Sequence, residues 1–295
     1  MKRIVLRILG GIFLLWLCFI AWGAATAWYP LPTYQTRLAS TDLLNRILDG
    51  DDYGAIINSH ARPLIVQAKI GEGEVLVYGA EHTKDPLSPS LNGIRTSFDE
   101  FQPTAVLCEG RMTGLLFPAF MDPVKTFGES GFVRAMAYEN GAPVWTWEPT
   151  AQVEVDGLLA QDFTKEQVAL RVILNPLFSN RRFGEPDDPS KAVEESIRLK
   201  ADWPVIGKLF SSTGDIEKTW KKHFPEGPDW RDVSDEFGLP GFMAKMDSNL
   251  VRDRHLLSII TDLTSRGERV FVVAGCSHAA KLQPALEHQE TLGRK

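Results

Sequence analysis

Cysteine is rare in this 295-residue chain, which has three, and basic residues nowhere form a block. Three cysteines are too few for a scaffold held together by disulfides. Lys and Arg total 32 against 38 Asp and Glu, which gives a net charge of −6. An acidic chain without a basic block lacks the surface that neutralises phosphates, so we expect no nucleic-acid partner.

Three common catalytic motifs are also missing: the Gly-x-Ser-x-Gly elbow, the P-loop and His-Glu-x-x-His. Serine hydrolases of the elbow type, P-loop nucleotide-binding proteins and zincins therefore find no support. The composition, 44% hydrophobic and 24% charged, is that of a globular protein and not of a disordered one. The length allows one large domain or two modest ones.

A long uncharged run stands near the N-terminus. Residues 8–28 contain no charged side chain, whereas Lys2, Arg3 and Arg7 precede them. A helix of this length spans the hydrocarbon core of a bilayer at about 1.5 Å per residue. The basic residues in front keep the N-terminus cytoplasmic under the positive-inside rule. We therefore predict one N-terminal transmembrane helix over residues 1–28.

A cleaved signal peptide is the alternative for the same segment, because Ala25-Thr26-Ala27 has the small-x-small form of a cleavage site. The uncharged run exceeds the ~7–15 residues usual for a signal peptide, which favours an uncleaved anchor. Under either interpretation residues 29–295 form an exported domain on the extracytoplasmic, periplasmic side, and it is secreted if the N-terminus is cleaved. In that oxidising setting Cys108 and Cys276 either form a disulfide or serve as small buried residues.

The exported part alternates short apolar runs with amphipathic segments, a pattern typical of an α/β fold with a mostly parallel central sheet and helices on both faces. Residues 150–245 lack strand-like runs, and we interpret them as a helical insertion. Residues 29–62 form a lead-in with a helical stretch near 41–48. The predicted strands are 75–78, 104–108, 143–147 and 269–274. The predicted helices of the α/β part are 91–101, 132–138, 248–265 and 279–288.

Ligands of open parallel sheets bind outside the carboxyl ends of the strands. Two of the predicted strands run into Gly-x-x-His: Gly79-Ala80-Glu81-His82 and Gly275-Cys276-Ser277-His278. Two others run into a glutamate, Glu109 and Glu148. Imidazoles together with a carboxylate commonly bind a divalent metal. The alternative is that these residues have structural roles only. The histidines would then form hydrogen bonds with the loop backbone, Glu109 and Glu148 would stabilise turns, and Glu81 would be an exposed carboxylate.

These motifs together resemble the TraB/PrgY/GumN family, which includes the TIKI membrane-anchored metalloproteases. The match covers roughly residues 70–150 and 245–290 and includes Arg252-Asp253 on a helix before the last strand. The resemblance implies a divalent-metal site formed by His82, Glu109 and His278, and metal-dependent hydrolysis, including peptide cleavage. Two departures concern the substrate: Glu109-Gly110-Arg111 stands where the family usually has Glu-Leu-Asp, and Glu148-Pro149 where Asp-Arg is frequent.

We therefore expect a metal-dependent hydrolase of peptide, amide or ester bonds that uses Mn, Co or Zn. Glu148 or Glu81 would transfer the proton, and Arg252 would bind a substrate carboxylate or steady Glu109. For Arg252 the alternative is an ordinary surface pair with Asp253 or a nearby acid.

Two other functions stay open for the same residues. The erythromycin esterase and haem-binding ChaN proteins share this fold superfamily, so one rival is a non-catalytic protein that binds haem or a small signal molecule. The other rival is a regulatory protein that sequesters a peptide. Three tryptophans of the insertion either line a substrate groove or pack its core: Trp203, Trp220 and Trp230.

Overall fold

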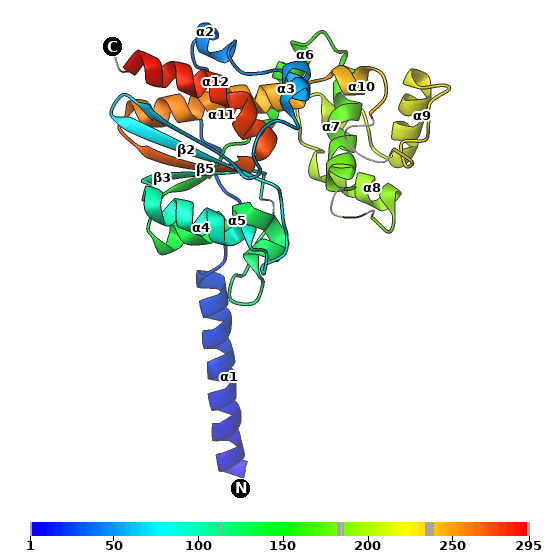
Figure 1. Cartoon of the computed structure of the whole chain (residues 1–295). Helices are drawn as coiled ribbons and strands as arrows, with labels where there is room; N and C mark the ends of the chain where they lie inside the picture. Colours follow the sequence, from blue (N-terminus) through cyan, green and yellow to red (C-terminus); the bar gives the residue numbers. More distant parts are fainter. Residues whose placement is uncertain (1, 113, 182–183, 185, 234–238, 294–295) are drawn as a thin grey trace. The chain divides into compact units, whose positions relative to one another are not determined.

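The computed structural model describes residues 2–112, 114–181, 184, 186–233 and 239–293, with side chains from Leu9 onward (Figure 1). The chain divides into two compact units. The first unit consists of residues 1–148 and 253–295, and the second unit consists of residues 149–252.

A five-stranded sheet forms the centre of the first unit. The strand order is β1-β2-β5-β3-β4; β1 pairs antiparallel with β2, and the remaining neighbours are parallel. The predicted α/β class with a mostly parallel sheet is thus confirmed. The strands are β1 (Leu64–Ile70), β2 (Gly73–Ala80), β3 (Ala105–Cys108), β4 (Val144–Thr146) and β5 (Arg269–Gly275).

Two features of the sheet differ from the sequence interpretation. The edge strand β1 was not predicted, and its pairs with β2 run from Leu64–Gly79 to Ile70–Gly73. In addition, β5 lies between β2 and β3, although it comes last in the chain. Local patterns identify a strand by its buried faces, but the order of strands depends on long-range pairing that such patterns do not encode.

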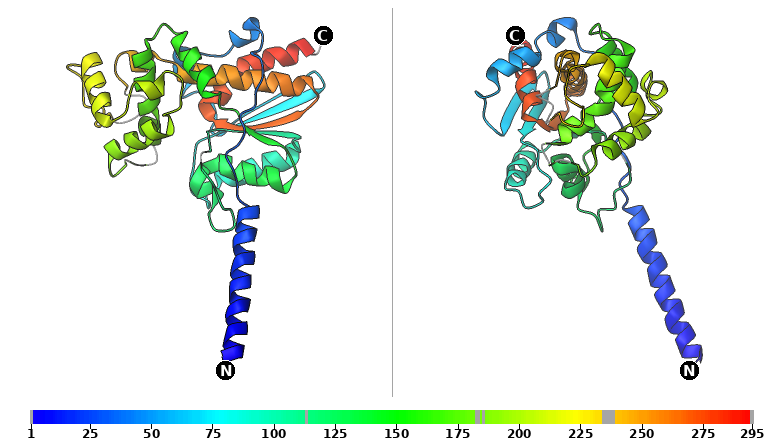
Figure 2. Two further views of the ribbon diagram at one scale, coloured as in Figure 1. Left: turned by 180° about the vertical axis from the view of Figure 1, so that it is seen from behind. Right: turned by 90° about the vertical axis from the view of Figure 1, so that its right-hand side faces the viewer.

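Helices cover both faces of this sheet (Figures 1 and 2). α4 and α5 pack on one face, where Phe98 and Phe271 meet with ring centroids 5.2 Å apart. α12 packs on the other face beside α11. The helices of the first unit are α1 (Lys2–Ala25), α2 (Thr41–Leu44), α3 (Gly50–Ile56), α4 (Ser90–Phe101), α5 (Pro123–Glu139) and α12 (Cys276–Gly293); α11 (Ser248–Ser265) begins in the second unit and continues in the first.

Two helices, α5 and α12, begin earlier than predicted, and the turns before the predicted starts carry residues of the candidate site described below. Asp122 caps α5 by accepting from the backbone of Val124 and Lys125, and Pro123 occupies its first turn. α5 has a kink at Gly128, whose φ is 59°. α12 starts directly after β5, at Cys276, so His278 lies in its first turn.

Cys108 and Cys276 are both buried and both free. The disulfide alternative is therefore wrong for this structure, and the cysteines behave as small apolar residues. Burial raises the pKa of the Cys108 thiol to about 12, so this group stays protonated at neutral pH.

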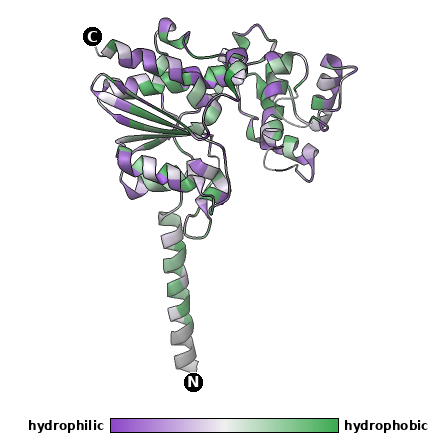
Figure 3. Ribbon diagram, viewed as in Figure 1, coloured by the Kyte–Doolittle hydropathy of each residue, from purple (hydrophilic) through white to green (hydrophobic). Residues whose placement is uncertain are grey.

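The N-terminal helix α1 carries exposed apolar side chains along its described length, among them Leu15, Trp16 and Phe19. Figure 3 colours much of the described part of this helix as hydrophobic. Among the described residues, no helix has the length and apolarity needed to span a bilayer. The side chains of Lys2, Arg3 and Arg7 lie outside the described part.

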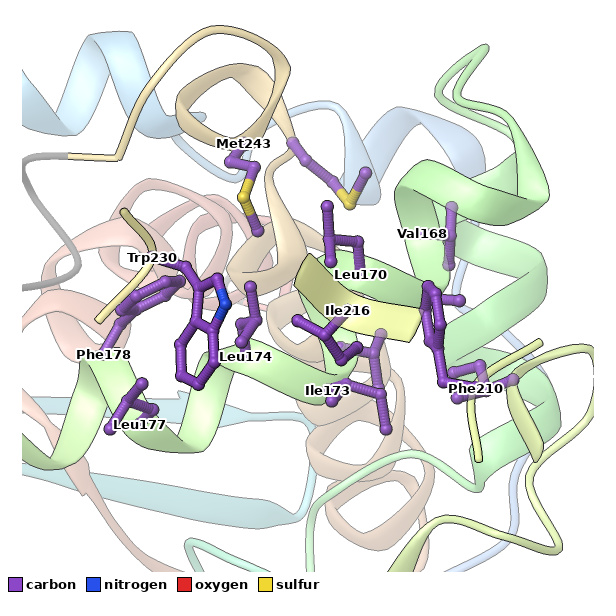
Figure 4. Close-up of a cluster of buried hydrophobic side chains, with 14 of the residues drawn as sticks. Val168, Leu170, Ile173, Leu174, Leu177, Phe178, Phe210, Ile216, Trp230 and Met243 are labelled. Carbon is purple, nitrogen blue, oxygen red and sulfur yellow. The ribbon is translucent and has the colours of Figure 1, made fainter. Parts of the chain in front are cut away.

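The second unit is helical, and its described residues contain no strand. A capping box formed by Thr164 and Gln167 begins its central helix, and the apolar cluster of this unit gathers around that helix (Figure 4). Trp220 and Trp230 are buried in the cluster and Trp203 packs against it, which favours their interpretation as core residues. The helices are α6 (Ala151–Leu159), α7 (Lys165–Asn180), α8 (Pro189–Leu199), the 3₁₀ turn Ile206–Lys208, α9 (Thr213–His223) and α10 (Phe242–Lys245).

Candidate functional site

The two Gly-x-x-His segments lie side by side at one edge of the sheet. They belong to the neighbouring parallel strands β2 and β5, in which Ala80 is paired with Gly275. Since β2 ends at Ala80 and β5 at Gly275, both histidines follow the same sheet edge.

The glycine of each motif makes room for the other motif. A Cβ atom on Gly79 would lie 3.0 Å from the Cα of Cys276 and 2.8 Å from the Cβ of Ala279, on the first turn of α12. A Cβ atom on Gly275 would lie 2.6 Å from Nε2 of His82. The paired spacing therefore has a steric reason, because both close approaches require glycine.

His278 is buried and held by a carboxylate of α11. Its Nδ1 lies 2.5 Å from Oδ1 of Asp253, whose side chain is fully buried. The ammonium of Lys281, one turn further along α12, lies 3.3 Å from Oδ2 of the same carboxylate. The ring of Trp147 contacts the imidazole edge to face, with centroids 5.0 Å apart. This chain of contacts fixes the orientation of His278.

The contact with Asp253 also determines how the two nitrogens of His278 are placed. A carboxylate accepts hydrogen bonds, so Nδ1 is the donor in this contact. The other nitrogen, Nε2, lies 3.6 Å from Oε1 of Glu109. A proton on Nε2 or a cation bound between these two atoms would make that contact favourable.

Glu109 follows the end of β3 and lies beside His278 and Gly275. Its Oε2 accepts a hydrogen bond of 2.7 Å from the backbone N–H of Gly275, the residue against which the His82 ring packs. The structure thus brings His82, Glu109 and His278, the predicted site residues, together around Gly275.

His82 has a buried carboxylate partner of its own. It adopts a left-handed backbone conformation with a φ of 66°, and its Nδ1 lies 3.9 Å from Oε2 of Glu129. Glu129 follows the kink of α5 and accepts a 2.5 Å hydrogen bond from the backbone of Thr83. Each histidine therefore directs Nδ1 toward a buried carboxylate and leaves Nε2 on the side of Gly275 and Glu109.

The other predicted residues lie differently. Glu148 is 3% exposed and accepts a 3.0 Å hydrogen bond from the N–H of Gly110, the residue after Glu109, so it belongs to the same strand-end region. Glu81 is exposed. Arg252 belongs to the second unit, where it donates to Asn249. Asp253 is fully buried, so a surface pair of Arg252 with Asp253 is wrong, whereas a surface pair with another nearby acid stays a prediction.

His255, which has no motif around it in the sequence, is buried and lies near enough to Glu148 to feel its charge. Burial lowers the pKa of its imidazole, the charges of Glu148 and Arg111 act on it in opposite directions, and it bonds to the backbone of Tyr34. Its Nε2 is buried and has no hydrogen-bond partner among the described residues. A histidine in this state is neutral at pH 7.

Two further contributors were missed, Lys281 and Glu129, and Asp253 was named only as part of the Arg252-Asp253 pair. A signal existed for Asp253, because it lies three residues after Leu250 and four before Leu257, on the apolar face of α11. Lys281 follows His278 by three residues on one helix, which places both on one face. No local pattern identifies Glu129. The kink at Gly128 interrupts α5, so the sequence does not show that the helix begins before Glu129.

Imidazole nitrogens and carboxylate oxygens are common ligands of divalent metals. A histidine that binds a metal through one ring nitrogen usually donates a hydrogen bond from the other nitrogen, often to a carboxylate. As the side chains stand, however, the described residues contain no group of three or more His, Cys, Asp or Glu that could hold a metal ion.

Comparison with known proteins adds no relative: no family model matches the chain, and no curated protein or solved structure is significantly similar to it.

Proposed function

We propose that this protein is a membrane-anchored, exported, metal-dependent hydrolase of the TraB/PrgY/GumN type that cleaves a peptide, amide or ester bond. The proposed metal ligands are His82, Glu109 and His278, and the proposed metal is Mn, Co or Zn.

One observation carries the proposal: both strand-end histidines have Nδ1 beside a buried carboxylate and Nε2 beside Glu109 or its partner Gly275. Histidines that only bond loop backbone have no need for two separate carboxylates buried behind them. The donor types fit a divalent metal, and the donor atoms would have to draw together to bind it.

Each side chain has a definite task in this proposal. Asp253 and Glu129 orient the two imidazoles, and the N–H of Gly275 fixes one oxygen of Glu109. When bound, a divalent metal supplies a water of lowered pKa and polarises a carbonyl group. Glu148, held by the N–H of Gly110, is the proposed group that accepts and returns the proton, and exposed Glu81 is the second candidate.

The proposed location follows from the N-terminal segment. Residues 8–28 carry no charge, and large apolar side chains of α1 are exposed from Leu9 to Trp22. A helix that is apolar all round is stable when lipid covers it. The anchor therefore keeps the two units on the extracytoplasmic side of the membrane.

Metal content measured by mass spectrometry tests the site. The full chain is purified in detergent without a histidine-rich tag, beside His82→Ala and His278→Ala, with His288→Ala as a matched control. We expect near-stoichiometric metal in the wild type and in the control, and loss of metal in both site variants.

A wild-type protein that stays metal-free after soaking with Mn, Co and Zn would overturn the metal site. An absorption band of haem in that preparation would instead favour a binding protein of the same fold.

A further inference from the structure

The segment between β3 and α5 contains an exposed apolar loop. Residues 114–121, Gly-Leu-Leu-Phe-Pro-Ala-Phe-Met, carry no charge. Within it Leu115 is 51%, Phe120 53% and Met121 41% exposed. Single exposed apolar side chains are ordinary on a protein surface, but a contiguous group marks a surface that binds something.

Both ends of this loop are held in place. Leu116 is buried, and its backbone exchanges two hydrogen bonds with Trp28, of 2.7 and 3.1 Å. Asp122 follows the loop and caps α5. The exposed side chains are therefore presented by a fixed backbone and are not the ends of a loose segment.

The loop contacts the last turns of α1. The ring of Phe120 lies 4.9 Å from that of Phe19 and 6.0 Å from that of Trp22, measured between centroids. A Cβ atom on Gly23 would lie 3.1 Å from the ring of Phe120. Phe19 and Trp22 are themselves about half exposed, at 53% and 52%. One continuous apolar surface thus joins helix and loop.

We propose that loop 114–121 inserts into the lipid interface on the extracytoplasmic side, beside α1. This inference rests on the proposed membrane anchor. Lipid is the occupant that fits, because the loop lies beside the uncharged end of α1, where Trp22 is exposed, and aromatic side chains prefer that depth of a bilayer. Asp122, which follows the loop, would remain in the headgroup layer.

Insertion of the loop gives the first unit a second contact with the membrane. Two contacts restrict rotation of the unit about the anchor, whereas one helix followed by a flexible chain does not. The sheet edge with its histidines would then be held in a fixed orientation over the bilayer.

Fluorescence quenching in lipid nanodiscs tests this inference on the full chain. An environment-sensitive fluorophore is attached to Phe120→Cys in a Cys18→Ser background, since Cys108 and Cys276 are buried. Leu115→Cys is an independent second position, and Leu38→Cys, an exposed leucine at 64%, is the control. Native Cys18 in α1, labelled separately, reports on the anchor itself.

We expect blue-shifted emission at positions 115 and 120, with quenching by lipids that carry a quencher near the headgroup, and neither effect at position 38. Labelled Cys18, in the middle of the uncharged run, should be quenched by lipids that carry the quencher deep in the acyl chains. Quenching at Cys18 without quenching at 115 and 120 would overturn the loop inference and leave the anchor intact. Absence of quenching at all positions would overturn the anchor and this inference with it. Equal quenching at position 38 would indicate general adsorption and would also overturn it.

Discussion

Nδ1 of His278 and Oδ1 of Asp253 are 2.5 Å apart, although the two residues are 25 positions apart in the sequence and belong to different helices. Both side chains are buried, and Lys281 supplies a positive charge to the same carboxylate. A buried carboxylate that accepts from one nitrogen of an imidazole orients the ring and directs the other nitrogen away from it, an arrangement common to metal-binding histidines.

Replacing Asp253 by Asn should lower metal affinity about 10- to 100-fold, as loss of such a partner usually does. The neutral amide holds the Nδ1–H of His278 less strongly than the carboxylate does, so the ring loses its fixed orientation. Competition with a coloured chelator measures the affinity. Asp99→Asn, an exposed position on α4, is the control; unchanged affinity in a folded Asp253→Asn protein would show that Asp253 has no orienting role.

Glu129→Gln should weaken metal binding less than Asp253→Asn does. The contact between Glu129 and His82 is 3.9 Å, beyond hydrogen-bond length, compared with 2.5 Å for Asp253 and His278. The same chelator titration measures the difference, with Glu139→Gln, exposed at the end of α5, as the control. An equal or larger loss than for Asp253→Asn would reverse the order of importance that these distances predict.

Gly275→Ala should displace His82 and leave the fold intact. The three atoms nearest to the added Cβ all belong to the His82 ring, a side chain that can rotate away. We expect metal affinity to fall while the free energy of unfolding changes by less than about 1 kcal/mol. Gly54→Ala, where no atom lies within 4 Å of the added Cβ, is the control for the substitution itself. Unfolding curves and the chelator titration, run on the same samples, separate the two effects.

Stability should fall below about pH 6.5, and His255 should account for part of the loss. Burial lowers the pKa of His255 in the folded protein, so between that pKa and 6.5 the unfolded chain binds a proton that the native protein does not. A single such group contributes at most about 1.4 kcal/mol per pH unit, and nothing above that window.

Urea unfolding between pH 5 and 8 measures this slope. We expect His255→Leu to reduce it, and His60→Leu, at a partly exposed histidine, serves as the matched replacement. A slope that is identical in His255→Leu and in the wild type would mean that other groups cause the acid sensitivity.

The sequence by itself determined the parts of this protein that depend on neighbouring residues. Short apolar runs predicted β2, β3, β4 and β5, because strands buried on both faces need continuous apolar side chains. The two Gly-x-x-His segments and Glu109 were found by their position after those runs, and the structure brings these residues together around Gly275.

Only the tertiary structure decided which carboxylates contact the Nδ1 atoms of the two histidines. β5 had to insert between β2 and β3 before Gly275 could meet both His82 and Glu109. Asp253 and Glu129 come from helices on opposite faces of the sheet, and no local periodicity links either of them to its histidine. The reason is physical: a buried carboxylate is stable only where a distant partner reaches it, and that partner is chosen by packing across the whole unit.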